Sequence, residues 1–325
     1  MKNEFIEIEI DSSKQIVLWD YLNRKKFRIS QNLAELILKY FRTNNIEKFE
    51  NREIKCLKEL GIHLEETQKN KELINLKRKW EKYGWKEAAK YHISTLDYPF
   101  RGKRDLGLDI MIKYNSEEED NFRGKNYPET ALEYHLDDID ENLLEVEGMN
   151  KSKLFLTLKY AFCYSNFVDA KWTSTKIFQR TTPSGGSRQP TEGYVFVNGI
   201  ENVQTGLYYI NGEKKTLQCI KYGLDISNNY KKLFPVYFSN RDGKIGAVVI
   251  LTSIFEKNMY RYREARTFRS IHMDVGHITG LIEGFGKQYK FNTFVHYATD
   301  EKFIESELGV HHLEEGYQTA ILIEE

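Results

Sequence analysis

The stretch RTTPSGGSRQPTEGY, residues 180–194, joins two adjacent glycines to two arginines, two prolines and an acid. It leads into the alternating YVFV at 194–197, a pattern typical of a strand. Adjacent glycines let backbone amides approach a ligand because no Cβ stands in the way. Exposed N–H groups can hold an anion or a polar ring edge, and Arg180 and Arg188 have donors suited to phosphate. The stretch is therefore a candidate ligand-binding loop, with a plain Gly-Gly-Ser turn as the alternative.

The composition is that of a globular chain without a charge bias. Of 325 residues, 40% are hydrophobic and 14% aromatic, and 48 basic residues balance 48 acidic ones. This balance argues against a broad nucleic-acid footprint. No apolar run is long enough for a transmembrane helix, and the start, MKNEFIEIEIDSSK, has no signal-peptide pattern. The three scattered cysteines match no zinc spacing and are typical of a reducing compartment. We predict a cytoplasmic protein with no metal site, and with no nucleic acid or membrane as partner.

Residues 1–68 predict a small winged-helix-like module. EFIEIEI (4–10) alternates like a strand, Ser30 suits the N-cap of a helix, and residues 50–61 predict a second helix that ends at Gly61. IHLEE (62–66) is expected to return as a strand. Such a module binds DNA or clamps a peptide that extends its sheet. The second helix mixes acids with lysines, which favours the clamp.

The rest of the chain predicts a connecting helix over residues 69–92 and a large domain over 93–325. Gly84 is expected to break or bend the connecting helix. The large domain begins with loop-like sequence, followed by a helical pattern over 151–167. Short strand patterns separated by turns then lead to a helix of about twenty residues in TFRSIHMDVGHITGLIEGFG (267–286).

Four stretches, in order, resemble the SagB/McbC-type peptide dehydrogenases, a branch of the nitroreductase-like flavoproteins. RTTPSGGSRQPTEGY resembles the family's R-x-x-P-S-G-G-x-R-x-P-x-E-x-Y, and residues 202–223 resemble its G-L-Y-x-Y segment. RYREARTFR (261–269) resembles K-Y-G-x-R-x-x-R, and HMDVGHITGLI (272–282) resembles D-x-G-H-x-x-x-L. KYHISTLDY (90–98) is similar to the F-H-x-x-T that precedes the flavin domain. The resemblance covers residues 90–325, and the amino-terminal module suits the family's substrate-docking part.

The resemblance implies an α+β fold, in which a mostly antiparallel sheet flanked by helices follows the winged-helix-like module. It also implies a homodimer with FMN in a cleft between the subunits. The family oxidises thiazolines or oxazolines to azoles in ribosomally made peptides. This implies a precursor peptide as substrate and cyclodehydratase-type proteins as partners. The cofactor-binding residues that it implies are Arg180, Pro183, Ser184, Gly185, Gly186, Ser187, Arg188, Gln189 and Arg266.

The family's catalytic Lys-Tyr pair matches Arg261 and Tyr262 in this chain. Azoline oxidation removes a proton from one ring carbon and passes a hydride to the flavin. Arginine stays protonated, so Arg261 is expected to orient the substrate or to stabilise a phenolate at Tyr262, and Tyr262 is the candidate base. Asp274 and His277 lie three apart on the predicted helix, as either a structural or an acid–base pair.

Three departures from the family pattern leave a second function open. Arginine replaces the catalytic lysine, no arginine occurs between Pro128 and Gln179, and TFVHYATD (293–300) lacks the family's glycine-rich turn. The missing arginines weaken the expected phosphate site. The alternative to an enzyme is therefore a scaffold or peptide-binding subunit that has lost flavin chemistry. An FMN enzyme acting on a small molecule is a third reading, but it leaves the amino-terminal module without a role.

Overall fold

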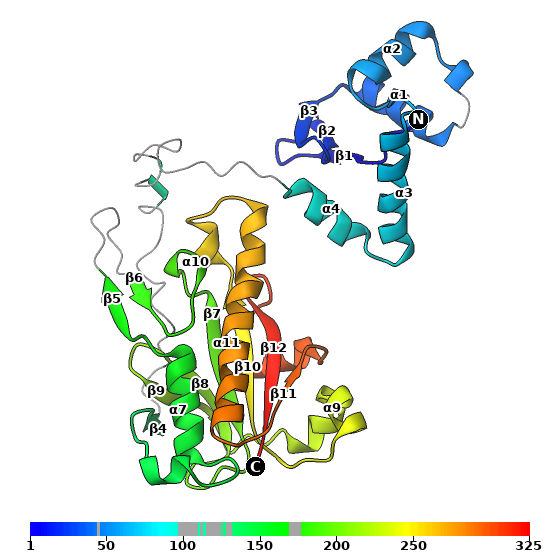
Figure 1. Ribbon diagram of the computed structural model, residues 1–325. Coiled ribbons are helices and arrows are strands. Elements are labelled where there is room, and N and C mark those ends of the chain that lie inside the picture. The colour runs from blue at the N-terminus through cyan, green and yellow to red at the C-terminus, as the bar shows by residue number, and fades with distance from the viewer. Residues whose placement is uncertain are drawn as a thin grey trace. The chain divides into compact units, whose positions relative to one another are not determined.

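The computed structural model describes residues 1–43, 46–96, 110, 113–114, 125, 127, 132–168 and 177–325. The chain divides into two compact units, Met1–Phe100 and Arg101–Glu325 (Figure 1). Because the positions of these units relative to one another are not determined, each is described by itself.

The smaller unit is a three-stranded antiparallel sheet with four helices. Its strands are β1 (Ile6–Ile10), β2 (Ile16–Asp20) and β3 (Lys25–Arg28), in the order β1-β2-β3. The helices are α1 (Gln31–Arg42), α2 (Asn51–Glu59), α3 (Gln68–Lys82) and α4 (Lys86–Ser94), with a 3₁₀ turn η1 at Ile46–Lys48. The prediction of a strand at 62–66 is wrong, since His63 makes only an isolated bridge to Lys2.

Local sequence signals set the helix ends of this unit. The Ser30 side chain accepts a hydrogen bond from the Leu33 amide and so caps α1, as predicted. The expected connecting helix is broken at Gly84, which has a φ of 79° and lies between α3 and α4. A left-handed backbone cannot continue a helix, and glycine adopts it without a Cβ penalty.

The larger unit is built on a seven-stranded sheet in the order β11-β12-β10-β7-β8-β9-β4, with every neighbouring pair antiparallel. The predicted α+β class with a mostly antiparallel sheet is confirmed. The strands are β4 (Glu133–His135), β7 (Thr191–Val197), β8 (Gly206–Asn211), β9 (Thr216–Tyr222), β10 (Ile245–Ile254), β11 (Thr293–His296) and β12 (Glu315–Glu324). A separate hairpin pairs β5 (Asn166–Val168) with β6 (Ile177–Gln179).

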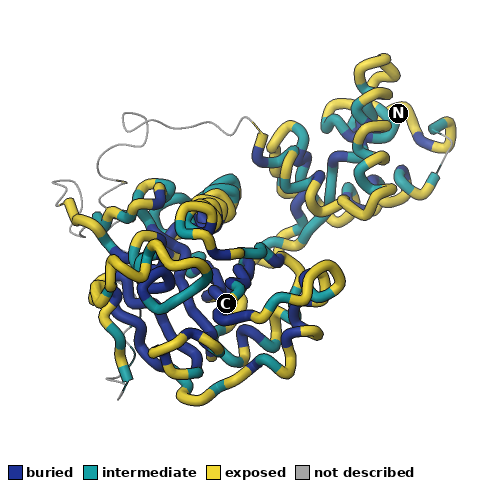
Figure 2. Tube along the Cα trace, turned by 60° about the horizontal axis from the view of Figure 1, so that its bottom comes forward, coloured by how far each residue is buried: buried dark blue, intermediate teal, exposed yellow. Residues whose placement is uncertain are grey.

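Helices cover both faces of this sheet. The long helices α7 (Lys151–Phe162) and α11 (Phe268–Gln288) pack on one face, in front of the sheet in Figure 1. Shorter helices supply the other face: α8 (Tyr230–Leu233), α9 (Pro235–Asn240) and α12 (Glu301–Leu308). The remaining short turns are η2 (Glu141–Leu144), η3 (Gly185–Ser187), η4 (Ser227–Asn229), η5 (Ala265–Thr267) and α10 (Glu256–Met259). The strands between the two layers are almost entirely buried (dark blue in Figure 2).

The alternation of side chains along β7 decides which residues face each layer. Val195 and Val197 pack with α7 and α11, whereas Tyr194 and Phe196 pack with the layer of shorter helices. Successive strand residues point to opposite faces, so Glu192 lies on the same face as Tyr194. The carboxylate of Glu192 is thereby placed inside the core, where it needs hydrogen-bond donors or an ion-pair partner.

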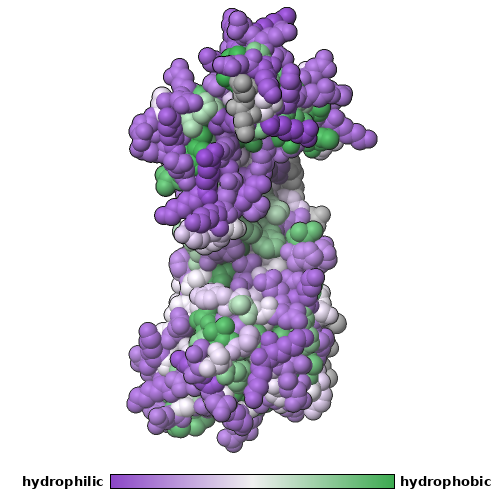
Figure 3. Space-filling view, turned by 90° about the vertical axis from the view of Figure 1, so that its right-hand side faces the viewer, coloured by the Kyte–Doolittle hydropathy of each residue, from purple (hydrophilic) through white to green (hydrophobic). Residues whose placement is uncertain are grey.

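Hydrophilic side chains cover most of the face seen in Figure 3 (purple). None of the helices within the described ranges combines the length and the apolar character that a membrane crossing requires.

Stability of the larger unit should fall in mild acid because of His296. Its ring is 2% exposed, meets the Phe234 ring edge-to-face at 5.4 Å, and has no hydrogen-bond partner among the described residues. Burial lowers the pKa of His296 below its usual 6.5. The folded form then takes up its proton at lower pH than the unfolded chain does. The contribution of the neutral His296 ring to the free energy of unfolding is therefore fully present above pH 6.5 and is lost as the pH falls below that value.

Thermal unfolding at pH 7.5 and 5.5 tests this for the wild type and a His296→Leu variant. Each tenfold difference in proton affinity between the folded and unfolded chain is worth about 1.4 kcal/mol. The wild type should lose more stability than the variant, which keeps an apolar side chain at that place. Equal losses in the two proteins would assign the acid sensitivity to other groups.

Candidate functional site

The glycine-rich loop connects β6 to β7 and is held by helix α11. The carboxylate of Asp274 accepts the Ser184 hydroxyl at 2.7 Å and the Gly185 amide at 3.2 Å. One turn further along α11, Nδ1 of His277 donates to the Pro183 carbonyl oxygen at 3.0 Å. Burial raises the pKa of Asp274, and the two hydrogen bonds oppose that change. The predicted helix pair thus anchors the loop, which supports its structural interpretation.

The two glycines allow the loop to approach side chains of this same chain. Gly186 has a φ of 64°, and a Cβ built there would overlap the hydroxyl of Tyr262. A Cβ on Gly185 would lie 3.3 Å from that of Ser270. The space that the glycines leave is therefore occupied by Ser270 and by the candidate base. Tyr262 lies directly against the loop although 76 positions separate it from Gly186 in the sequence.

Most amides of the loop have partners within the chain. Besides the Gly185 amide, the Ser187 amide donates to the Ser184 carbonyl at 3.0 Å and the Arg188 amide to the Gly185 carbonyl at 3.4 Å. The Gln189 amide donates to the Ser184 hydroxyl oxygen at 2.9 Å. Four of the five amides from 185 to 189 are thus paired. Because these amides are already paired, the loop cannot bind an anion through a set of free backbone N–H groups. An anion here would need side-chain donors.

Two arginines supply such donors beside Tyr262. Nε of Arg188 donates to the Lys257 carbonyl at 2.7 Å, and the guanidinium of Arg261 lies 5.9 Å from the centre of the Tyr262 ring. Burial and the charge of Arg261 lower the pKa of Arg188, and Tyr262 opposes this change. An anion bound between two like charges reduces the repulsion between them. Arg266, in η5, is half-buried.

Arg180 and Gln189 point into the protein. Nη1 of Arg180 donates to the Thr191 carbonyl at 2.8 Å, and its guanidinium stacks at 5.0 Å over the Tyr164 ring. Its Nε is buried with no hydrogen-bond partner in the described part of the chain. Gln189 is buried with a φ of 50°, in the left-handed region. These two predicted cofactor residues therefore anchor the loop to the interior of the protein.

A buried ion pair, not predicted from the sequence, lies under the loop. Lys257 of α10 pairs with Glu192 of β7, and their side chains are 2% and 3% exposed. Nζ of Lys257 also donates to the Gln189 carbonyl at 3.2 Å, and the Tyr209 hydroxyl donates to Glu192 at 2.8 Å. Burial would raise the pKa of Glu192, but Lys257 and Arg180 outweigh it and lower that pKa. The only signal in the sequence is an acid at a core-facing position of an apolar strand.

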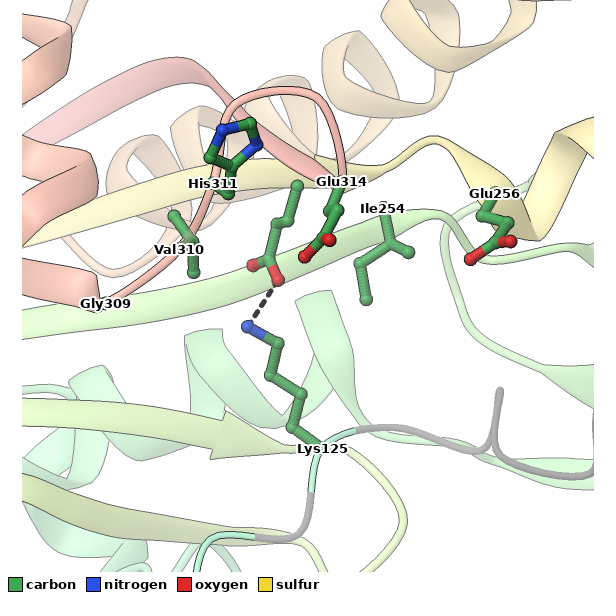
Figure 4. Close-up of a pocket in the computed structure, with 8 residues that line it drawn as sticks. Lys125, Ile254, Glu256, Gly309, Val310, His311 and Glu314 are labelled. Atoms are coloured by element: carbon green, nitrogen blue, oxygen red, sulfur yellow. Dashed lines mark ion pairs between the residues drawn. The ribbon is translucent and has the colours of Figure 1, made fainter.

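A second polar cluster lies at the same end of the sheet and opens to a pocket of about 470 Å³. Glu315, the first residue of β12, pairs with Lys125 and accepts hydrogen bonds from the Tyr194 hydroxyl at 2.8 Å and the Thr252 hydroxyl at 2.7 Å. Burial and Glu315 raise the pKa of Tyr194 well above 10. In Figure 4 the dashed line from Lys125, which lies on a separate segment of the chain, marks this ion pair. The pocket is lined by Lys125, Ile254, Glu256, Gly309, Val310, His311, Glu314 and Glu315.

Hydrogen bonds join the loop to this pocket. The Gln189 carbonyl binds Lys257, Lys257 pairs with Glu192, and Glu192 accepts from Tyr209. The Tyr209 hydroxyl in turn accepts the Lys125 amide at 3.2 Å. Strands β7, β8, β10 and β12 thus bring both polar clusters to one end of one sheet.

No protein-family model matches this chain. It is similar to the trifolitoxin-processing protein TfxB of Rhizobium leguminosarum bv. trifolii, with 32% identity over 124 residues. The match covers 38% of this chain and spans about a third of that relative, 33% of its length.

Two solved structures are also similar. A putative nitroreductase from Anabaena variabilis has 19% identity and a TM-score of 0.49, covering 61% of this chain and 39% of its own. A chain of the Escherichia coli microcin synthetase McbBCD complex with truncated pro-MccB17 bound has 16% identity and a TM-score of 0.45, covering 71% and 84%.

Proposed function

For this nitroreductase-like protein of the SagB/McbC type, we propose an FMN-dependent oxidoreductase activity on a ribosomally made precursor peptide. The family assignment was predicted from ordered motifs and is confirmed by the similarity to TfxB. The observation that carries the proposal is the contact of the Tyr262 hydroxyl with Gly186, beside Arg188 and Arg261. The two guanidinium groups place several charge-assisted hydrogen-bond donors beside this hydroxyl.

The proposed reaction is the oxidation of an azoline ring to an azole. FMN, when bound, would accept the hydride. As the phenolate, Tyr262 would take the proton from the neighbouring ring carbon and become a neutral phenol, and Arg261 would stabilise the phenolate before that transfer. The residues proposed to hold the cofactor phosphate are Arg188 and Arg266, because the loop amides are already paired. The other loop residues, Pro183 to Ser187, would form the wall of this site.

We also propose that the site is completed by a second copy of the chain. Gly276, Gly280 and Gly284 recur every four residues on α11, and all are exposed. Apart from the adjacent residues and the nearby helix backbone, no atom of the described residues lies within 4 Å of a Cβ built on them. Met273, 64% exposed, extends this stripe by spacing. Glycines permit close helix approach, and α11 also carries Asp274 and His277, which hold the loop.

The smaller unit is proposed to dock the precursor peptide. β3 is an edge strand that pairs only with β2 among the described strands, and its sequence KKFR makes this edge basic. An extended acidic segment could add to such an edge through backbone hydrogen bonds. We propose cyclodehydratase-type partner proteins and a cytoplasmic location on the same grounds as the family assignment. The alternative function is a scaffold subunit without flavin, which the paired loop amides favour.

Mixing the purified chain with FMN tests the proposed function. We expect FMN to co-elute with a dimer, as measured by absorption spectroscopy and light scattering. Charge-assisted hydrogen bonds contribute about 1.5–3 kcal/mol each, so Arg188→Gln combined with Arg266→Gln should weaken FMN binding at least tenfold. Arg241→Gln is the matched control, because Arg241 pairs with Glu324 instead. A colourless protein that rejects FMN would favour the scaffold.

A further inference from the structure

The pocket beside Glu315 has a strong charge asymmetry. Three carboxylates line it, against one lysine and one imidazole. Lys125 is already paired with Glu315, whose side chain is 5% exposed. The charges of this buried pair therefore cancel. Glu256 and Glu314 are exposed at the rim, and neither has an ion-pair partner among the described residues. The accessible part of the pocket is therefore negative.

The walls suit a side chain that is apolar along its stem and charged at its end. Ile254 and Val310 are half-buried and line the pocket together with Gly309. The side chains of Glu314 and Glu256 lie on either side of Ile254 (Figure 4). The volume of about 470 Å³ lies within the roughly 300–1,000 Å³ typical of ligand sites. Long basic side chains bury their stem against apolar surface and keep the charged group at polar partners.

We propose that this pocket binds an arginine side chain of a peptide. The guanidinium would lie between Glu256 and Glu314, where a planar group with several donors can bind two carboxylates at once. A free anion is disfavoured, because Lys125, the one lysine among the described residues that line the pocket, already neutralises Glu315.

The position of the pocket connects it with the proposed reaction. Glu256 begins α10, and backbone hydrogen bonds continue from Tyr260 to Glu256 and from Tyr262 to Asn258. Helix α10 itself ends at Met259, and Tyr262 follows three residues later. The same segment therefore carries the pocket rim at one end and Tyr262 at the other. The proposal rests on the proposed function only for the claim that the bound arginine belongs to the substrate.

Binding of two short peptides to the full chain without flavin tests the pocket. Ac-Ala-Arg-Ala-NH₂ should bind at least tenfold more tightly than its citrulline counterpart, which has the same shape without the charge, as measured by calorimetry. Glu256→Gln combined with Glu314→Gln should remove this preference. Glu201→Gln combined with Glu213→Gln, two exposed acids outside the pocket, should leave it unchanged.

Equal binding of the two peptides, or an arginine preference that survives in the rim variant, would overturn the proposal. Unfolding curves of the variants verify that the fold is intact. Because these measurements need neither FMN nor turnover, a chain that selects arginine but rejects FMN would contradict only the proposed function.

Discussion

Lys257→Met should lower the free energy of unfolding of the larger unit by about 3–5 kcal/mol. The variant removes the cation but leaves the carboxylate of Glu192, whose side chain is 3% exposed. An uncompensated buried charge is far more costly than the loss of a surface pair. The loop loses a contact as well, since Nζ of Lys257 binds the Gln189 carbonyl. Denaturant unfolding measures the change.

Two matched variants separate charge from packing at this position. Adding Glu192→Gln removes the second charge and keeps an acceptor for the Tyr209 hydroxyl, so the double variant should be more stable than Lys257→Met alone. Lys244→Met breaks an exposed pair with Glu325 and should cost less than about 1 kcal/mol. If Lys257→Met costs no more than Lys244→Met, the buried pair does not stabilise the unit as argued.

Tyr262→Phe should reduce turnover of the FMN-loaded protein by about 10²–10⁴-fold, the usual contribution of a general base. The ring and its stacking with Arg261 remain, so only the proton acceptor is removed. Affinity for FMN should stay within a few-fold of the wild type, since the proposed phosphate donors are Arg188 and Arg266. Single-turnover reduction of the flavin by a peptide azoline measures the chemical step.

Tyr260→Phe is the matched control for this experiment, because it removes a hydroxyl from the same segment two residues away. Its turnover should be close to that of the wild type. Unchanged turnover in a yellow Tyr262→Phe protein would exclude Tyr262 as the base.

Much of the fold was predictable because its signals are local. Ser30 marks a helix start, Gly84 a helix break, and the spacing of apolar residues identifies α11 as a long helix. The strand at 62–66 was predicted wrongly because five residues contain too little pattern to distinguish an isolated bridge from a strand.

Only some residues of the candidate site could be predicted from the sequence. Its motifs identified the loop, Tyr262 and the Asp274–His277 pair, and the structure brings all of them together. The role of the glycines was not predictable, since their spacing cannot show whether a ligand or Tyr262 occupies the freed space. The Lys257–Glu192 pair was missed because neither residue belongs to a recognisable pattern.

By itself, the sequence determined the helix and strand segments, the chemistry of the loop and the family resemblance, because these depend on neighbours within a few positions. Only the tertiary structure decided how that chemistry is used. It closes the loop on Asp274 across 90 positions and pairs Lys257 with Glu192 across 65. It also sets two carboxylates, neither of which forms an ion pair with a described residue, around one pocket. Burial and charge pairing arise between segments that only folding brings into contact, so no local pattern encodes them.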